Sequence, residues 1–169
     1  DTVKLIQDEL DGIPFILKGI MTAEDAALAV EHGVNAVYIS NHGGRQLDHV
    51  LGNIDMLTEI IAAVDGKVDV IAGTHYKDTK RTIEDAKRIQ DMGAIGLQVC
   101  PPIFNLPSQE DLLDFYSELS DAIGIGILVY VTAGMNCPID LGTYKKMTNL
   151  ENIVGIKWST PPEGASWES

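Results

Sequence analysis

Two groups of side chains in this sequence could do chemistry. In the first, Lys18 ends an apolar run, and Ser40, His42 and Arg45 share the phrase Ser-Asn-His-Gly-Gly-Arg. Histidine can take a proton near neutral pH, glycines let the backbone turn beside a ligand, and arginine binds a carboxylate through two hydrogen bonds. A lysine in an apolar strand favours an anion or a polar cofactor edge as its partner. The simpler interpretation is a glycine turn with incidental charges.

The second group lies near the end of the sequence. Tyr130 ends the run Ile-Leu-Val-Tyr, and Lys157 ends the run Ile-Val-Gly-Ile-Lys. Apolar surroundings favour an uncharged amine, which attacks a ketone to form a Schiff base. A tyrosine on the neighbouring strand can move protons to and from the carbinolamine and the imine. The alternative is a lysine that reaches solvent and a tyrosine of the core.

Other titratable side chains receive plainer interpretations. His32, His49 and His75 are predicted to be helix-end or loop residues. Cys100 and Cys137 have no metal-ligand spacing, so we interpret them as structural thiols in a reducing compartment.

Apolar runs of strand length alternate with stretches whose apolar residues lie three and four apart, as in amphipathic helices. This alternation predicts a parallel sheet, because strands that are buried on both faces have continuous apolar sequences. One strand and one helix per unit is the repeat of a (β/α) TIM barrel. We therefore predict an α/β fold of TIM-barrel type, partial or chimeric, with six units. The predicted strands are 15–17, 36–39, 68–72, 95–100, 127–131 and 153–156.

Polar residues and glycines mark the predicted helix boundaries. Ser108 and Asp111 have the spacing of a capping box. Gly33, Gly93 and Gly124 stand where helices are expected to end, since glycine adopts the left-handed conformation easily. The predicted starts are Thr22, Asp78 or Thr79, Ser108 and Asp140.

Composition limits the possible partners. The chain has 169 residues, which predicts a single domain over 1–169, and its net charge of -13 disfavours nucleic acid and anionic membranes as partners. Its apolar stretches are shorter than the roughly 20 residues of a membrane-spanning helix, and it shows no signal peptide. A cytoplasmic location is the resulting expectation.

Residues 13–66 resemble the FMN-dependent 2-hydroxy-acid oxidases and dehydrogenases, chiefly through Ser-Asn-His-Gly-Gly-Arg-Gln-Leu-Asp at 40–48. The resemblance implies FMN as cofactor, with Lys18 facing the flavin ring and Ser40 touching it. It also implies that His42 is the base and that Arg45 holds the substrate carboxylate. The family's phosphate-binding Asp-Gly-Gly and Gly-Arg turns are replaced by Ala-Gly-Thr at 72–74 and Cys-Pro-Pro at 100–102.

Residues 67–160 resemble the dihydrodipicolinate synthase and N-acetylneuraminate lyase family. The matching motifs are Val-Ile-Ala-Gly-Thr at 70–74, Pro-Pro-Ile-Phe-Asn-Leu-Pro-Ser-Gln at 101–109, and the runs that end at Tyr130 and Lys157. The resemblance implies a cofactor-free lyase in which Lys157 forms the imine and Tyr130 relays protons. The family's Gly-Thr-Thr-Gly-Glu and Pro-Gly-Arg turns are replaced by Asn-His-Gly-Gly and Ala-Gly-Met, so an arginine for the substrate carboxylate is missing. Arg45 is a candidate replacement.

Three functions therefore remain open. The leading prediction is a hybrid barrel, flavin-enzyme-like over 1–66 and aldolase-like over 67–160 with a tail at 161–169, that acts as a Schiff-base lyase on a 2-keto acid such as pyruvate. The alternatives are an FMN-dependent 2-hydroxy-acid oxidoreductase and an inert scaffold. Both enzymatic functions imply a small molecule as partner, a keto acid for the lyase or a hydroxy acid for the oxidoreductase. Two exposed sheet edges would also favour association of copies into a homo-oligomer.

Overall fold

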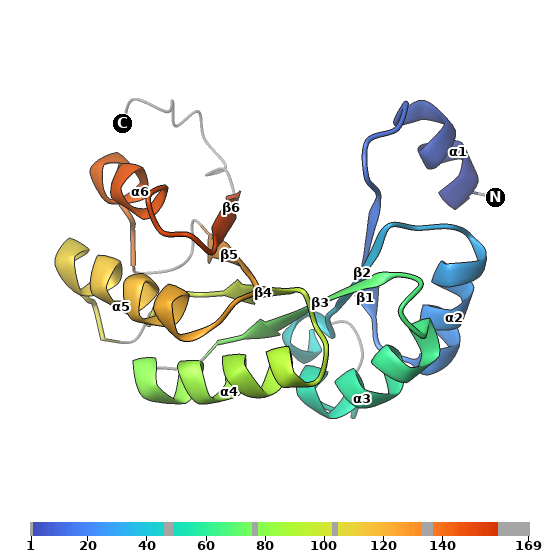
Figure 1. Ribbon diagram of the computed structural model, residues 1–169, viewed down its shortest axis with the longest axis horizontal. Helices are drawn as coiled ribbons and strands as arrows, with labels where there is room; N and C mark the ends of the chain where they lie inside the picture. Colours follow the sequence, from blue (N-terminus) through green and yellow to red (C-terminus); the bar gives the residue numbers. More distant parts are fainter. Residues whose placement is uncertain (1, 46–48, 76–77, 103–104, 133–136, 159–169) are drawn as a thin grey trace. The chain divides into compact units, whose positions relative to one another are not determined.

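The computed structural model in Figure 1 describes residues 2–45, 49–75, 78–102, 105–132 and 137–158. The tail predicted at 161–169 lies outside these residues. In the described chain, strands and helices alternate after a first helix. The elements are α1 (Thr2–Glu9), β1 (Ile16–Ile20), α2 (Ala23–Glu31), β2 (Ala36–Ile39), the 3-10 turn η1 (His42–Gly44), α3 (Asn53–Val64), β3 (Asp69–Thr74), α4 (Thr79–Asp91), β4 (Gly96–Val99), α5 (Gln109–Ala122), β5 (Gly126–Val131), α6 (Leu141–Met147) and β6 (Ile153–Trp158).

The strands form a six-stranded sheet in chain order, β1-β2-β3-β4-β5-β6. The pairs β1–β2, β2–β3 and β5–β6 are parallel. Parallel neighbours joined through helices are the repeating units of a TIM barrel, so the predicted partial α/β barrel is confirmed. No helix in the described part of the chain is long and apolar enough to cross a membrane.

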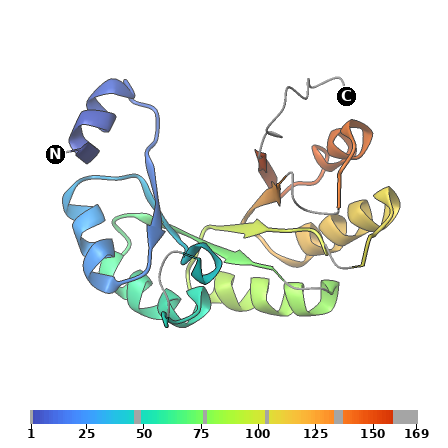
Figure 2. The same cartoon turned by 180° about the vertical axis from the view of Figure 1, so that it is seen from behind.

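The chain divides into two compact units, which we describe separately. Unit 1 comprises Asp1–Gly73 and Ile89–Gly96. Its helices α2 and α3 pack against each other, as Figures 1 and 2 show, and α2 also contacts β1. Val37, Ile39, Leu57 and Ile60 are fully buried there. Burial of these side chains fixes the positions of β1 and β2, whose carboxyl ends carry the first group of candidate residues.

Unit 2 comprises Thr74–Arg88 and Leu97–Ser169, and α5 packs against α6 within it. Its core includes the fully buried Leu112 and Tyr116 of α5. The Tyr116 hydroxyl donates a hydrogen bond to the Val99 carbonyl oxygen over 3.0 Å. Burial raises the pKa of Tyr116 well above its usual value, so this hydroxyl stays protonated and links α5 to β4.

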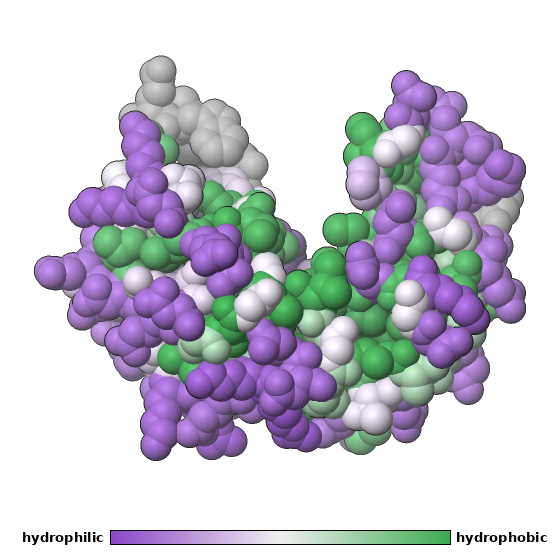
Figure 3. Space-filling model, viewed as in Figure 1, coloured by the Kyte–Doolittle hydropathy of each residue, from purple (hydrophilic) through white to green (hydrophobic). Residues whose placement is uncertain are grey.

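The helix starts follow the predicted capping residues. The Asp25 N–H donates to Thr22 Oγ1 over 3.0 Å, and the Thr143 N–H donates to Asp140 Oδ1 over 2.6 Å. Ser108 and Asp111 form a reciprocal capping box, as expected. Helices α2, α4 and α5 end two residues before the predicted glycines Gly33, Gly93 and Gly124, and Gly33 and Gly93 have positive φ. Hydrophilic residues cover most of the visible face of α4 (Figure 3), in keeping with its many charged residues.

Burial on both faces of every strand was predicted, and it holds only for some. All residues of β2 and β4 are buried. In β6, exposure alternates, and Val154 is 70%, Ile156 43% and Trp158 44% exposed. The expectation was therefore wrong for β6. Apolar sequence alone does not show whether a helix covers the outer face of a strand, and β6 is the last strand in the order of the described sheet.

Candidate functional site

The first candidate site is a polar cluster in unit 1, which we call the Lys18 cluster: Lys18, Ser40 and His42. Lys18 lies in β1, Ser40 directly follows β2, and His42 begins η1. Lys18 Nζ donates to Ser40 Oγ over 2.8 Å and lies 3.2 Å from His42 Nε2. The His42 N–H also donates to Ser40 Oγ, over 3.2 Å. Three residues that the sequence separates are thus joined by hydrogen bonds.

Backbone geometry on both sides of the cluster brings these side chains together. Gly19 has φ +105°, and the register between β1 and β2 shifts between Lys18 and Ile20. A Cβ atom on Gly19 would lie 3.5 Å from His42 Cε1, so the histidine ring packs close to this glycine. His42 itself has φ +55°, a left-handed conformation that is uncommon for a residue with a side chain.

Arg45 occupies a different position from the Lys18 cluster. Its side chain is exposed, and its Nε donates to the His42 carbonyl oxygen over 3.2 Å. Arg45 is therefore tied to the turn that carries His42. Its proposed contact with a substrate carboxylate, in either site, stays a prediction.

The second candidate site is in unit 2, at the carboxyl ends of β5 and β6. Tyr130 and Lys157 are paired neighbours in these parallel strands. Lys157 Nζ lies 4.0 Å from the centroid of the Tyr130 ring, within the range of a cation–π contact. Strand alternation directs Val154 and Ile156 to the opposite face, and Lys157 is half-buried. The apolar residues before Lys157 therefore do not surround its amine as the sequence suggested.

Two residues that sequence reasoning did not include lie beside this pair. The His75 ring centroid is 6.3 Å from that of Tyr130, and His75 Nδ1 accepts a hydrogen bond from the Cys100 N–H over 3.3 Å. His75 follows β3 and Cys100 follows β4. The available signal was their position directly after predicted strands, where ligands bind in barrels. We call His75, Cys100, Tyr130 and Lys157 the Lys157 cluster.

The Cys100 thiol is an unreactive member of the Lys157 cluster. Burial raises its pKa to about 12, and the nearby charge of Lys157 opposes this shift only in part. A thiol must lose its proton to act as a nucleophile, so Cys100 is not suited to covalent catalysis near neutral pH. Cys100 and Cys137 are both buried and free, in agreement with their interpretation as structural thiols.

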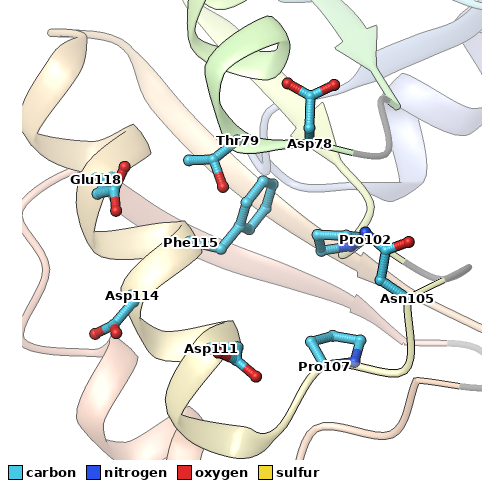
Figure 4. Close-up of a pocket in the computed structure, with 9 residues that line it drawn as sticks. All are labelled: Asp78, Thr79, Pro102, Asn105, Pro107, Asp111, Asp114, Phe115 and Glu118. Carbon is cyan, nitrogen blue, oxygen red and sulfur yellow. The ribbon is translucent and has the colours of Figure 1, made fainter.

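A separate pocket of about 440 Å³ lies in unit 2 between the starts of α4 and α5 (Figure 4). None of the predicted site residues lines it. Two of its four carboxylates serve as helix caps: Asp78 accepts the Arg81 N–H over 2.8 Å, and Asp111 accepts the Ser108 N–H over 2.9 Å. Its lining residues are Asp78, Thr79, Pro102, Asn105, Pro107, Asp111, Asp114, Phe115 and Glu118. Within the described residues, no group of three or more His, Cys, Asp or Glu could hold a metal ion.

The chemistry of the candidate residues can be compared with the two ends of FMN, the flavin ring and the phosphate. The Lys18 ammonium and the Ser40 hydroxyl are donors for the polar edge of a flavin ring. A phosphate needs backbone N–H groups or cations. In the flavin family, the phosphate-binding turns follow two strands. At those positions this chain has residues 72–74 and 100–102, and Pro101 and Pro102 have no backbone N–H. The Lys18 cluster therefore fits the flavin ring, whereas the described residues 72–74 and 100–102 lack the family's phosphate-binding turns.

Sequence comparisons match the first part of the chain to flavin enzymes. The FMN-dependent dehydrogenase family matches residues 1–74. The chain is 64% identical over 91 residues to 2-hydroxyacid oxidase 2 of Homo sapiens, a match that covers 54% of this chain and 25% of that protein. It is 49% identical over 88 residues to L-lactate oxidase of Lactobacillus jensenii, covering 52% and 22%. The chain thus spans about a quarter of the length of these curated relatives.

Comparisons with solved structures concern the fold of most of the chain. A dihydrodipicolinate synthase from Acinetobacter baumannii, complexed with pyruvate, has a TM-score of 0.73 and 24% identity, with 87% of this chain and 55% of that chain covered. N-acetylneuraminate lyase from Mycoplasma synoviae has a TM-score of 0.68 and 20% identity, covering 89% and 56%. The first part of the chain is therefore similar in sequence to FMN-dependent 2-hydroxy-acid oxidases, and most of the chain has a TIM-barrel fold like that of the dihydrodipicolinate synthases and N-acetylneuraminate lyases.

Proposed function

We propose that the Lys18 cluster binds a flavin ring and a 2-hydroxy acid, as the site of an FMN-dependent 2-hydroxy-acid oxidoreductase. The observation that carries this proposal is the hydrogen-bonded arrangement of Lys18, Ser40 and His42. All three residues lie inside the segment that matches the flavin-dependent family. This support is stronger than that for a lyase, because sequence identity reaches 64% in the flavin-enzyme comparison.

The geometry supports a basic role for His42. His42 Nε2 lies 3.2 Å from Lys18 Nζ, and in the neutral tautomer with its proton on Nδ1 the ring accepts a hydrogen bond from the ammonium at Nε2. In that tautomer Nε2 has one lone pair, which can act as a general base once the flavin replaces it as the acceptor for Lys18. We assign to this atom the removal of the proton from the substrate's 2-hydroxyl group. The flavin, when bound, supplies the electron acceptor for the oxidation.

Lys18 and Arg45 have supporting roles in this proposal. Lys18 would donate to the polar edge of the flavin ring from its place beside Ser40. The guanidinium of Arg45, held by its Nε contact to the His42 carbonyl oxygen, would bind the substrate carboxylate through its terminal nitrogens. The two cations would then contact different molecules, which separates cofactor binding from substrate binding.

Flavin binding tests the proposal. We expect FMN and riboflavin to bind with affinities within about threefold of each other, because residues 72–74 and 100–102 replace the family's phosphate-binding turns. Lys18→Met should weaken both about tenfold or more, through loss of a charged hydrogen-bond donor. Flavin fluorescence quenching measures the affinities, and Lys67→Met, at an exposed lysine, is the matched control. Absence of quenching by the folded wild-type chain would exclude a flavin site.

A second function is supported by the contact between Lys157 Nζ and the Tyr130 ring at 4.0 Å. We propose that the Lys157 cluster forms a Schiff base with a 2-keto acid, with Tyr130 moving the protons. Borohydride reduction in the presence of pyruvate would trap the imine, and peptide mapping would locate the adduct. The expected adduct is on Lys157 and disappears in Lys157→Ala; a folded chain without it would exclude this function.

A further inference from the structure

We propose that His75 is a substrate-binding residue of the Lys157 cluster and that its Nε2–H binds the carboxylate of a 2-keto acid. This inference rests on the Schiff-base function proposed above. It assigns a role to a residue outside both groups of candidates identified in the sequence. It also supplies the carboxylate donor that the sequence of this part of the chain was expected to lack.

The position of His75 relative to the reacting amine is the first argument. The centroid of the His75 ring lies 6.3 Å from the centroid of the Tyr130 ring, and Lys157 Nζ lies 4.0 Å from that Tyr130 centroid. His75, Tyr130 and Lys157 belong to unit 2, and each stands at the carboxyl end of a strand, β3, β5 and β6. Side chains at these ends of parallel strands meet the ligand in barrel enzymes.

The protonation of the imidazole is the second argument. The Cys100 N–H donates to His75 Nδ1 over 3.3 Å. A backbone N–H can only donate, so Nδ1 is an acceptor and the proton of the neutral ring is on Nε2. The hydrogen bond from the Cys100 N–H therefore favours the His75 tautomer whose proton is on Nε2, the ring nitrogen farther from the backbone. A carboxylate is a suitable acceptor for such a donor.

The chemistry of imine formation is the third argument. The Lys157 amine forms a C–N bond to the keto carbon, and the carbinolamine then loses its oxygen as water to leave the imine. The carboxylate of a 2-keto acid is one C–C bond from that carbon, so its binding residue must lie near Lys157. His75 and Lys157 both lie beside the Tyr130 ring, at 6.3 Å between ring centroids and 4.0 Å from Nζ to the centroid. Cys100 lies beside it as a neutral thiol, because burial raises its pKa to about 12, and so it does not repel a carboxylate.

Two variants of His75 separate its proposed donor from its structural contact. In His75→Asn, the side-chain oxygen can still accept the Cys100 N–H, but the donor at the Nε2 position is removed. In His75→Gln, the amide nitrogen can occupy the Nε2 position and donate. The measurement is the yield of borohydride-trapped adduct on Lys157 in the full chain, followed by intact mass as the concentration of pyruvate or of acetone increases. Acetone has the ketone without the carboxylate.

We expect His75→Asn to raise the half-saturating pyruvate concentration about tenfold or more, and His75→Gln to restore much of the loss. Half-saturation by acetone should not change in either variant. Equal losses for pyruvate and acetone would show that His75 only maintains the structure, and unchanged values in His75→Asn would also overturn the proposal. A folded wild-type chain that forms no Lys157 adduct with either ketone would instead overturn the Schiff-base function, and this inference with it.

Discussion

The two lysine clusters differ in what holds the amine. Lys18 Nζ donates to Ser40 Oγ over 2.8 Å and lies 3.2 Å from His42 Nε2, so polar atoms fix it as a donor. Lys157 Nζ lies over an aromatic face, 4.0 Å from the Tyr130 centroid. An amine that must hold a ligand benefits from fixed hydrogen bonds, whereas one that must attack a carbonyl needs an available lone pair. In the functions proposed above, the same residue type would bind a ligand in unit 1 and form a covalent bond in unit 2, where Lys157 must first lose its proton.

Exchange of each lysine for methionine should separate the two functions completely, and this is the largest effect we expect. Lys157→Met should abolish the trapped pyruvate adduct and leave flavin affinity within about twofold of wild type. Lys18→Met should weaken flavin binding about tenfold or more and leave the adduct yield unchanged. Intact mass and flavin fluorescence measure the two outcomes. Loss of both activities in either variant would show that the clusters do not act separately.

Local sequence was sufficient to predict the strands and most helix starts. The run at 36–39 became β2 with the predicted bounds, and Thr22 and Ser108 cap their helices as expected. Both signals depend on neighbouring residues: an apolar run excludes water, and a capping side chain bonds to an N–H three positions ahead. The exposed outer face of β6 was not predicted, because burial depends on elements distant in sequence.

The candidate sites were only partly predictable for the same reason. His42 was found because the motif around it is compact, and its contact with Lys18 follows from the pairing of β1 with β2. His75 was interpreted as a loop residue. His75 joins the Lys157 cluster through its contacts with the Cys100 N–H and the Tyr130 ring, which lie at the ends of other strands. Such contacts depend on strand order and register, which a single sequence does not give directly.

Cavities in the two cores should show whether the units differ in stability. Leu57 of unit 1 and Leu112 of unit 2 are fully buried, so Leu57→Ala and Leu112→Ala should each cost about 2–5 kcal/mol of stability. We expect amide hydrogen exchange to accelerate most in the unit that carries the substitution. Leu28→Ala and Leu141→Ala, at residues that are 50% and 62% exposed, are the matched controls. Equal acceleration across both units would show that they unfold together.

Helix caps in the two units should differ in how much they stabilise the fold, with a smaller effect than the core leucines. In unit 1, Thr22 Oγ1 accepts the Asp25 N–H over 3.0 Å. In unit 2, the Asp111 N–H donates to Ser108 Oγ over 3.2 Å, and the Ser108 N–H donates to Asp111 Oδ2 over 2.9 Å. Ser108 Oγ also donates to Asp111 Oδ2 over 2.7 Å, so Ser108→Ala removes two hydrogen bonds and Thr22→Ala removes one. We therefore expect Thr22→Ala to cost about 0.5–1 kcal/mol and Ser108→Ala about 1–2 kcal/mol. Urea unfolding measures the difference, with Ser117→Ala inside α5 as the control.

Acid should reduce this difference between the caps. The hydrogen bonds from Ser108 hold the pKa of Asp111 below its usual 3.8. Asp111 binds a proton more readily in the unfolded chain, so its stabilising effect is present above pH 3.8 and is lost as the pH falls through the lower folded pKa. The cost of Ser108→Ala should therefore shrink at low pH, while that of Thr22→Ala changes less because its cap bond uses a hydroxyl. A cost of Ser108→Ala that is the same at pH 7 and well below 3.8 would show that the carboxylate contributes nothing to the cap.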